Sequence, residues 1–318
     1  MRRRTMRATV FGIALAVVIA VSSPHANAAS FPLFSGQQAV GTLGTYVTGD
    51  EDTLLDVARI NDLGYGQLVV VNPGIDPWLP GPGRRVTLPG VYLVPDGPRR
   101  GIVINLSEQR LYYFPPDGRT LETYPIGVGV QGWSTPLGMT QVTGKEVRPS
   151  WYPPSSIREE EPELPEVVPP GPDNPLGEYA LRLGWPSYLI HGTHKPYGVG
   201  RNVSHGCIRL YPEDIERLFG EVRVGTPVRV VDEEFRLAWI ESELYLVVFP
   251  NKQQMDELDV NEPMTPATPA GLRERVTDAA GTQIDRIDWR IVEYLGLKRP
   301  GIPYRITKPI QPDRSPGP

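Results

Sequence analysis

The chain has 318 residues and a formal net charge of −5, so it offers no basic field for nucleic acid and we expect no nucleic-acid partner. This length suffices for two domains with cores of their own. The high counts of proline and glycine, 36 and 33, favour strands, turns and extended linkers over a helical bundle. The single cysteine cannot form an internal disulfide.

Residues 1–28 have the pattern of a secretory signal peptide. Arginines near the start precede an apolar run from Ala8 to Val21, and the small-residue pattern Ala26-Asn27-Ala28 follows. The run is shorter than the roughly 20 residues that a membrane span needs, so an uncleaved anchor is the weaker interpretation. We therefore expect cleavage after Ala28, export to the periplasm and no stable membrane span in the mature chain.

Residues 45–93 predict a small module with the order β-α-α-β. A short strand at 46–48 leads through a turn into apolar residues at helical spacing over 54–60. A second short helix at 65–71 and a returning strand at 86–89 complete the unit. A small capping domain without a ligand is the alternative, because a fold alone does not fix a function.

Residues 98–232 predict a domain of short strands. The strands expected first, at 102–106, 111–114 and 121–126, are separated by turn residues, which is typical of a β-sandwich or barrel. Three later strands are expected at 179–183, 188–190 and 228–231. A helix is expected between them, beginning at Pro212 and ending at Gly220.

A proline-rich insertion at 149–175 interrupts this domain. Loops of this length without secondary structure are usually functional lids or disordered segments. Trp151 and Tyr152 at its start favour a packed lid, because large aromatic rings dominate packing where they are buried.

The chain beyond residue 232 predicts an α/β extension, residues 233–306. A strand is expected at 244–249, residues 253–282 are polar with scattered prolines, and residues 283–296 have helical spacing. The tail, residues 307–318, is rich in proline and is expected to be disordered.

Three of the four histidines lie close before the sole cysteine, Cys207. They are His191, His194 and His205. A thiolate is the working nucleophile in cysteine enzymes, and a nearby base or cation is needed to lower the pKa of the thiol. An exported protein meets oxidising conditions, so a cysteine that cannot pair is either buried and inert or retained for its reactivity.

Other chemistries also fit the cluster formed by Cys207 and these three histidines. The three histidines and Cys207 are of the right types for a zinc site, although structural zinc sites prefer paired cysteines. A redox sensor would lack a resolving partner in this chain, and free cysteine is among the most buried residue types. Acyl transfer by a Cys-His pair, without a metal, is the favoured hypothesis.

The residues of this region resemble the L,D-transpeptidase catalytic domain of the YkuD type. The matching segments are His191-Gly192-Thr193, Gly198-Val199-Gly200 and Ser204-His205-Gly206-Cys207-Ile208-Arg209-Leu210. Residues 169–177 and 301–303 resemble the ErfK/YbiS branch of that family. The resemblance implies a mainly β chain with a YkuD-type β-sandwich and a helix beside the site.

The module at 45–93 resembles LysM, a peptidoglycan-binding module with the pattern Y-x-V, G-D-x-L, N-P and V-x-L-P. Asp50-Glu51-Asp52-Thr53-Leu54 makes the first turn two residues longer than in that family. The ErfK/YbiS branch also carries an amino-terminal LysM module, so the resemblance implies binding to the cell wall.

The resemblance assigns roles to the site residues. Cys207 is the nucleophile and His191 its general base and acid, with the other ring nitrogen of His191 held by the carbonyl of Gly192. The supporting residues are Gly192, Ser204, His205, Gly206 and Arg209. His205 orients the site or aids the thiolate, or, like His194, is only structural. The amides near Gly206 are the expected oxyanion donors, and Arg209 either clamps a substrate carboxylate or pairs with Glu213 or Asp214.

The resemblance implies a ping-pong reaction on peptidoglycan stem peptides. Cys207 attacks the diaminopimelate carbonyl of a tetrapeptide stem and releases D-Ala, and an amine then takes the acyl group. A second stem gives a 3→3 cross-link, the terminal lysine of an outer-membrane murein lipoprotein gives a tether, and water gives an L,D-carboxypeptidase. No cofactor is expected, and carbapenems should acylate the thiol. A non-enzymatic wall-binding protein is the remaining alternative.

Overall fold

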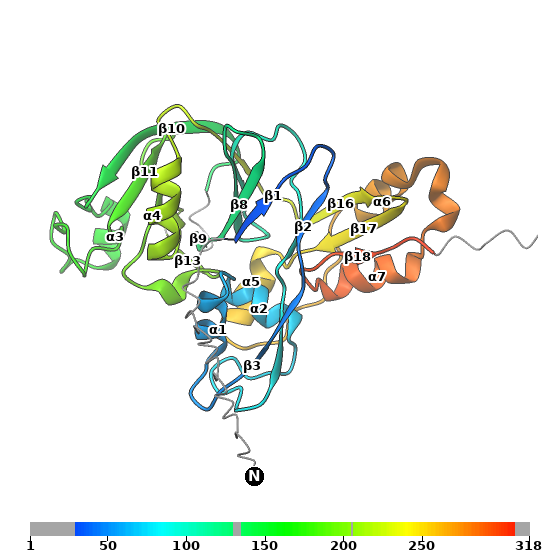
Figure 1. Ribbon diagram of the computed structural model, residues 1–318. Helices are drawn as coiled ribbons and strands as arrows, with labels where there is room; N and C mark the ends of the chain where they lie inside the picture. Colours follow the sequence, from blue (N-terminus) through cyan, green and yellow to red (C-terminus); the bar gives the residue numbers. More distant parts are fainter. Residues whose placement is uncertain (1–28, 130–134, 205, 309–318) are drawn as a thin grey trace, which may run out of the picture.

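The computed structural model describes residues 29–129, 135–204 and 206–308, and it shows a mainly β chain, as expected. The predicted signal peptide at 1–28 and the histidine at position 205 lie outside the described residues. Figure 1 shows a central β domain with a small module below it and an extension to one side.

A nine-stranded sheet forms the centre of the molecule. Its strands, in spatial order, are β1 (Ala29–Pro32), β8 (Thr120–Pro125), β7 (Arg110–Phe114), β6 (Gly101–Asn105), β15 (Pro227–Val231), β10 (Gly138–Val147), β11 (Tyr179–Leu183), β12 (Leu189–His191) and β14 (Ile208–Arg209). The long strand β10 belongs to both halves, because residues 138–141 pair with β15 and residues 142–147 pair with β11. A register shift lies between Val142 and Gly144.

The two halves of this sheet enclose one apolar core. Ile102 and Val228 contribute to it from one half, and Leu181 and Ile190 contribute from the other. The two layers expected of a sandwich are therefore parts of one continuous sheet that turns at β10. Burial of these side chains is the main force that holds the layers together.

Helix α4 (Pro212–Glu221) closes the core beside β11. Proline in the first turn suits a helix start, since its missing N–H would have no partner there. Ile215 and Leu218 form its buried face. The helix passes through Gly220, so the predicted end at that residue is wrong by one position. It ends where Val222 adopts extended backbone and inserts into the core.

The module has the expected strand-helix-helix-strand order. Its elements are β3 (Gly44–Val47), α1 (Leu54–Ile60), α2 (Tyr65–Val71) and β4 (Arg85–Leu88). A capping box formed by Thr53 and Asp56 starts α1. Leu54, Val57 and Leu68 pack in its core. Two further strands, β2 (Ala39–Gly41) and β5 (Val91–Leu93), pair with each other at the edge of the module.

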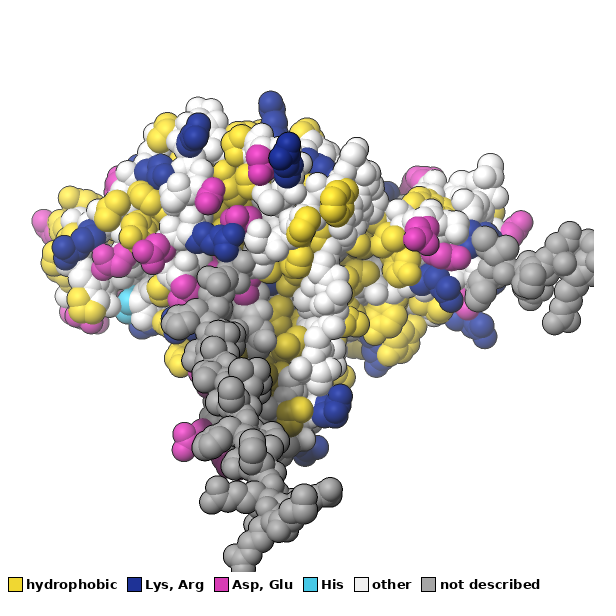
Figure 2. Space-filling view, in the orientation of Figure 1, with side chains coloured by type: hydrophobic (Ala, Val, Ile, Leu, Met, Phe, Trp, Pro, Cys, Tyr) yellow, Lys and Arg dark blue, Asp and Glu magenta, His cyan; other side chains and the backbone are white. Residues whose placement is uncertain are grey.

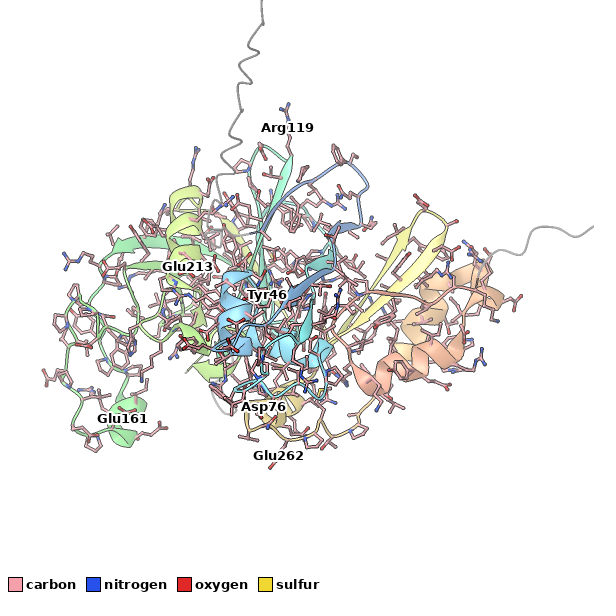
Figure 3. The ribbon with its side chains drawn as sticks, turned by 60° about the horizontal axis from the view of Figure 1, so that its bottom comes forward. Tyr46, Asp76, Arg119, Glu161, Glu213 and Glu262 are labelled. Atoms are coloured by element: carbon pink, nitrogen blue, oxygen red, sulfur yellow. The ribbon has the colours of Figure 1, made fainter. Side chains whose placement is uncertain are left out.

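The module packs directly on the central domain, as Figures 1 and 3 show. The amides of Tyr65 and Gly66 donate to the carbonyls of Val199 and Gly200 at 3.4 and 3.0 Å. Arg59 of α1 pairs with Glu213 of α4 at 2.9 Å. Because backbone, side chain and ion-pair contacts all cross this boundary, the module and the central domain form a continuous body.

The extension contains more helix than the sequence predicts. Its strands are β16 (Phe235–Ile240), β17 (Glu243–Val248) and β18 (Tyr304–Arg305), and its helices are α5 (Lys252–Asp259), α6 (Leu272–Ala280) and α7 (Trp289–Lys298). Helices α5 and α6 lie in the segment 253–282, where polar residues and prolines obscured them. A capping box of Asn251 and Gln254 starts α5.

The segment with helical spacing, residues 283–296, contains parts of two helices. Residues 281–286 form a short 3₁₀ helix, the backbone becomes extended at Ile287, and the side chain of Asp288 caps α7. The ordered chain also reaches two residues into the predicted tail. Thr307 is buried and bridges Ile287, whereas residues 309–318 lie outside the described part.

Within the described ranges, every helix is too short or too polar to cross a bilayer.

Candidate active site

A parallel strand pair brings the predicted catalytic residues together. Ile190 of β12 lies opposite Ile208 of β14, and His191 lies opposite Arg209. Both isoleucines are fully buried in the apolar core. Side chains alternate along a strand, so His191, Arg209 and the preceding Cys207 project from the other face of the sheet. The base and the nucleophile are thus diagonal neighbours on one face.

The geometry around His191 defines its tautomer. The imidazole is 3% exposed, and its Nδ1 lies 2.6 Å from the carbonyl oxygen of Gly192. A carbonyl only accepts hydrogen bonds, so Nδ1 carries the proton and Nε2 keeps a free lone pair. Glycine suits position 192 because there is little room for a side chain: a Cβ there would lie only 3.0 Å from a methyl group of Ile215.

Burial keeps this imidazole neutral. Burial and, second, the positive charge of Arg209 lower the pKa of His191 to about 3, although hydrogen bonds to the carbonyls of Gly192 and Leu176 act in the opposite direction. At neutral pH the ring is therefore an uncharged base.

The thiol of Cys207 is also uncharged at rest. Burial raises the pKa of Cys207, while a backbone hydrogen bond at Leu189 and the charge of Arg209 partly oppose this. The thiol donates to the carbonyl of Ser187 at 3.6 Å. Among the described residues, Arg209 lowers the thiol pKa as a nearby cation is expected to do, but desolvation outweighs it.

The peptide before Cys207 has a fixed orientation. Gly206 has φ +95°, a conformation that side chains on an L-residue rarely adopt. Its carbonyl accepts a hydrogen bond from the buried hydroxyl of Thr135 at 2.8 Å. In a trans peptide the N–H is antiparallel to the C=O, so the amide of Cys207 points away from Thr135.

Thr135 is a site residue that the sequence did not reveal. The segment 135–138 predicts only a tight loop or close backbone passage. Its distance of 71 positions from Gly206 along the chain left no local signal.

Arg209 is anchored by its backbone and presents its side chain to a cleft. Its N–H and C=O exchange hydrogen bonds of 3.0 and 2.9 Å with Gly127. Its Nε is buried and has no hydrogen-bond partner within the described chain. The alternative pairing with the acids of α4 does not occur, because Glu213 pairs with Arg59 and Asp214 lies beside Asp62.

A cleft of about 760 Å³ opens next to this face of the sheet. Basic groups and acidic groups both line it. They are His194, Lys195, Arg201, Arg209, Glu161 and Asp173. His194 is exposed in this cleft, so it is brought to the substrate side of the site without being part of the buried His-Cys face.

The proline-rich insertion forms one wall of the cleft and is packed. It carries the short helix α3 (Ser155–Glu160). The backbones of Trp151 and Val168 exchange two hydrogen bonds of 2.9 and 2.8 Å. The side-chain amide of Asn174 donates to the carbonyls of Pro149, Val168 and Pro169 at 2.9, 3.2 and 3.1 Å.

The comparisons with known proteins identify the family of this chain. The family model of the L,D-transpeptidase catalytic domain (YkuD) matches residues 99–230. A protein of Escherichia coli K12 named "Probable L,D-transpeptidase YcfS" is 36% identical over 310 residues, which cover 94% of this chain and 94% of the relative. The chain belongs to the L,D-transpeptidase family. The predicted resemblance to the YkuD catalytic domain is confirmed.

Two further E. coli K12 relatives agree with the predicted branch. "Probable L,D-transpeptidase ErfK/SrfK" is 42% identical over 65% of this chain and 69% of its own length. "Probable L,D-transpeptidase YbiS" is 42% identical over 71% of this chain and 75% of its own length. The chain is therefore an enzyme of this family whose near relatives include the ErfK/YbiS proteins.

The loop between His191 and Cys207 is held by both flanking parts of this L,D-transpeptidase. The hydroxyl of Tyr197 donates to Asp56 of the module at 3.2 Å. Arg201 pairs with Asp259 at the end of α5 at 3.0 Å and stacks 5.3 Å from the ring centroid of Tyr65. The module and the extension therefore determine the shape of the cleft together with the catalytic domain.

Ser204 and His205 are the remaining predicted site residues. Ser204 ends the short strand β13 (Asn202–Ser204), which pairs with β9 (Val128–Gly129). His205 lies outside the described residues, so its predicted role stays a prediction. Among the residues that are described, no three His, Cys, Asp or Glu side chains form a group able to hold a metal ion.

Proposed function

We propose that this L,D-transpeptidase transfers peptidoglycan stem peptides through a thioester on Cys207. The observation that supports the proposal is the parallel β12–β14 pair, in which His191 lies opposite Arg209, two residues after Cys207. Nε2 of His191 removes the thiol proton as Sγ attacks the substrate carbonyl. The Cys207 amide, oriented by the Thr135–Gly206 hydrogen bond, stabilises the negative oxygen of the intermediate.

The first half-reaction ends in release of D-Ala. His191 returns the proton to the leaving amine, the C–N bond breaks, and the acyl group remains on Sγ. In the second half-reaction an amine attacks the thioester, His191 accepts its proton, the C–S bond breaks, and His191 returns the proton to Sγ. Because the resting thiol and imidazole are both neutral, the thiol proton has to pass to His191 before or during the attack.

The basic groups of the cleft suit the donor stem. Arg201 and Arg209 lie in the cleft with Lys195, and guanidinium groups bind carboxylates bidentately. We assign to them the free carboxylates of the tetrapeptide stem. This places the scissile carbonyl at the β14 end of the cleft.

The acidic lid suits an amine as the acceptor. Exposed carboxylates gather on the α3 lobe, as Figure 2 shows, and they are Glu159, Glu160, Glu161, Glu163 and Glu166. Glu161 and Asp173 also face the cleft. A negative rim raises the local concentration of cationic partners, so we favour an amine over water as the acceptor, and of the two amines we propose the terminal lysine of an outer-membrane murein lipoprotein.

We further propose that the chain is exported to the periplasm by its signal peptide and that the module at 45–93 is a LysM-like unit that binds peptidoglycan. The strand-helix-helix-strand order of the module supports this. In this arrangement the module holds the enzyme on its polymeric substrate.

The test is product analysis with purified protein and sacculi, with and without a synthetic peptide that ends in the lipoprotein lysine. We expect D-Ala release and a peptide-linked muropeptide from the wild type, and neither product from Cys207→Ala. Transfer by Cys207→Ala would overturn the mechanism. Only 3→3 products in the presence of the peptide would overturn the lysine acceptor, and only shortened stems would identify a carboxypeptidase.

Binding to sacculi separates the enzyme from a purely wall-binding protein. Cys207→Ala should still bind sacculi if the module carries the affinity. Meropenem should add one adduct to the wild type and none to this variant. An unmodified wild-type mass would contradict a reactive thiol.

A further inference from the structure

Ala29, the first residue that the structure describes, contacts a buried acidic site. Ala29 begins β1, the edge strand of the central sheet, and lies opposite Thr123 of β8. Its backbone nitrogen donates to Oδ2 of Asp62 at 2.6 Å. Asp62 belongs to the module, in the loop between α1 and α2, so this contact joins the central sheet to the module (Figure 1).

Asp62 forms a pair with a second buried acid. Asp62 and Asp214 are only 5% and 2% exposed, and the two carboxyl groups lie close enough to influence each other's pKa. Each acid also has one buried oxygen with no hydrogen-bond partner among the described residues. Burial raises the pKa of both acids, and it raises the pKa of Asp62 to about 7.

Few positively charged side chains lie near the Asp62–Asp214 pair. Arg110 donates to the backbone carbonyl of Asp62 at 3.1 Å and is the strongest cationic influence on that acid. Arg59 and Arg217 are engaged by Glu213 and Glu122. The titratable and charged groups around the pair are Arg59, Tyr92, Arg110, Glu122, Tyr124, Tyr211, Glu213 and Arg217. The pair therefore needs a proton or another cation.

The sequence places a processing site beside this acidic pair. The pattern Ala26-Asn27-Ala28 predicts cleavage of the peptide bond between Ala28 and Ala29. Hydrolysis breaks that C–N bond, gives the hydroxyl of water to the new carboxyl group of Ala28, and leaves a protonated amine on Ala29. One amide donor then becomes an α-ammonium with three donors and a positive charge, whose ordinary pKa is about 8.

We propose that Asp62 and Asp214 form a binding site for the α-ammonium of the mature chain, which begins at Ala29. The ammonium takes the position that the Ala29 amide holds at 2.6 Å from Asp62. Its charge allows both acids to ionise together with Arg110. The inference rests on the proposed cleavage after Ala28.

Through this site, cleavage after Ala28 affects how the central sheet, the module and α4 pack together. Ala29 belongs to the edge of the central sheet, Asp62 to the module, and Asp214 to α4. The same region holds the catalytic strand, because Tyr211 donates to the carbonyl of Leu63 at 3.0 Å and the amide of Leu210 donates to the carbonyl of His191 at 2.9 Å. Processing thus stabilises the module against the catalytic domain.

The first experiment measures the intact mass of the exported protein, which should begin at Ala29. The second compares chain 29–318 with a free Ala29 amine and the same chain extended by Gly-Ser, each in wild-type and Asp62→Asn forms. The extension should lower the Tm of the wild type by about 2–4 °C and change that of Asp62→Asn by less than about 1 °C. Asp50→Asn, at an exposed acid of the same module, should keep the full effect of the extension.

An NMR titration of the amine, labelled by reductive ¹³C-methylation, provides a test on the wild type alone. We expect its pKa to lie at least one unit above the ordinary value of about 8. A mature chain that begins elsewhere, an ordinary amine pKa, or equal effects of the extension in wild type and Asp62→Asn would each overturn the proposal. Muropeptide products report on the transferase separately, so failure of this site and failure of the proposed function are distinguishable.

Discussion

At the scale of single residues, the catalytic pair is stored in its neutral form. His191 and Cys207 are both shifted by burial, the first toward the free base and the second toward the free thiol. A neutral pair avoids the cost of holding two charges in a desolvated site.

His191 should make the enzyme sensitive to acid through stability and not through loss of the base. Its pKa is about 3 in the folded chain and about 6.5 when unfolded, so the unfolded state binds a proton first as the pH falls. Stability contributed by this residue should fall between pH 6.5 and 3, by about 1.4 kcal/mol per pH unit. Urea unfolding of wild type and His191→Asn at several pH values measures this slope.

In this titration His191→Asn should show the shallower slope, and His194→Asn should change the slope less, because burial lowers the pKa of His194 as well but its side chain is exposed. Acylation by meropenem should show no inflection near pH 6.5 in the wild type. An inflection there, or identical slopes in all three proteins, would contradict the neutral buried base.

Thr135 should affect the catalytic rate through the Gly206–Cys207 peptide, which its hydroxyl orients. Thr135→Val keeps the side-chain shape but leaves the buried carbonyl of Gly206 without its hydroxyl donor. We expect kcat to fall about 10- to 100-fold, as when an oxyanion donor is misplaced, with little change in KM. Thr143→Val, at an exposed position of β10, is the matched control and should keep wild-type kinetics. A change in KM alone would argue against a role in the transition state.

At the scale of elements, α5 should influence substrate binding although it lies outside the catalytic domain. Asp259→Asn removes the charge that holds Arg201 at the cleft. We expect KM for the stem donor to rise about 3- to 10-fold, because partly buried ion pairs exceed the small contribution of exposed ones. Glu293→Gln, in an exposed pair with Arg273, should leave KM unchanged. An unchanged KM in Asp259→Asn would show that the loop keeps its shape without α5.

Local patterns explain which elements could be predicted. Alternating apolar residues identified β6, β7, β8 and β15, and apolar spacing after Thr53 identified α1. The helices α5 and α6 escaped notice because each buries only a narrow face within a polar segment. The start of α7 at the N-cap Asp288 was not predicted, since the capping role of Asp288 depends on its backbone conformation.

The catalytic motif could be predicted because its residues are chemically distinctive, whereas their electrostatic state could not. Burial of His191 and Cys207 depends on strands distant in sequence, and burial determines both pKa values. Thr135 and Asp259 were missed for the same reason. Each acts on the site across more than 50 residues of chain.

At the scale of the whole molecule, the close approach of two glycines should determine whether the module stays docked. Gly200 has φ +78°, and a Cβ there would lie 2.2 Å from the amide nitrogen of Tyr65 and 2.4 Å from Cα of Gly64. These neighbours are backbone atoms and cannot move aside without displacing α2. Gly200→Ala should therefore separate the module from the catalytic loop and not merely strain one residue.

Gly225→Ala supplies the matched control for this prediction. Gly225 has φ +90°, but a Cβ there would meet nothing within 4 Å. Both variants carry the backbone strain of about 1–2 kcal/mol that a left-handed alanine imposes, and only Gly200→Ala adds the clash. We expect a larger fall in Tm and faster hydrogen exchange over residues 45–93 in Gly200→Ala. Equal Tm values and equal exchange in the two variants would show that the module is not held by this contact.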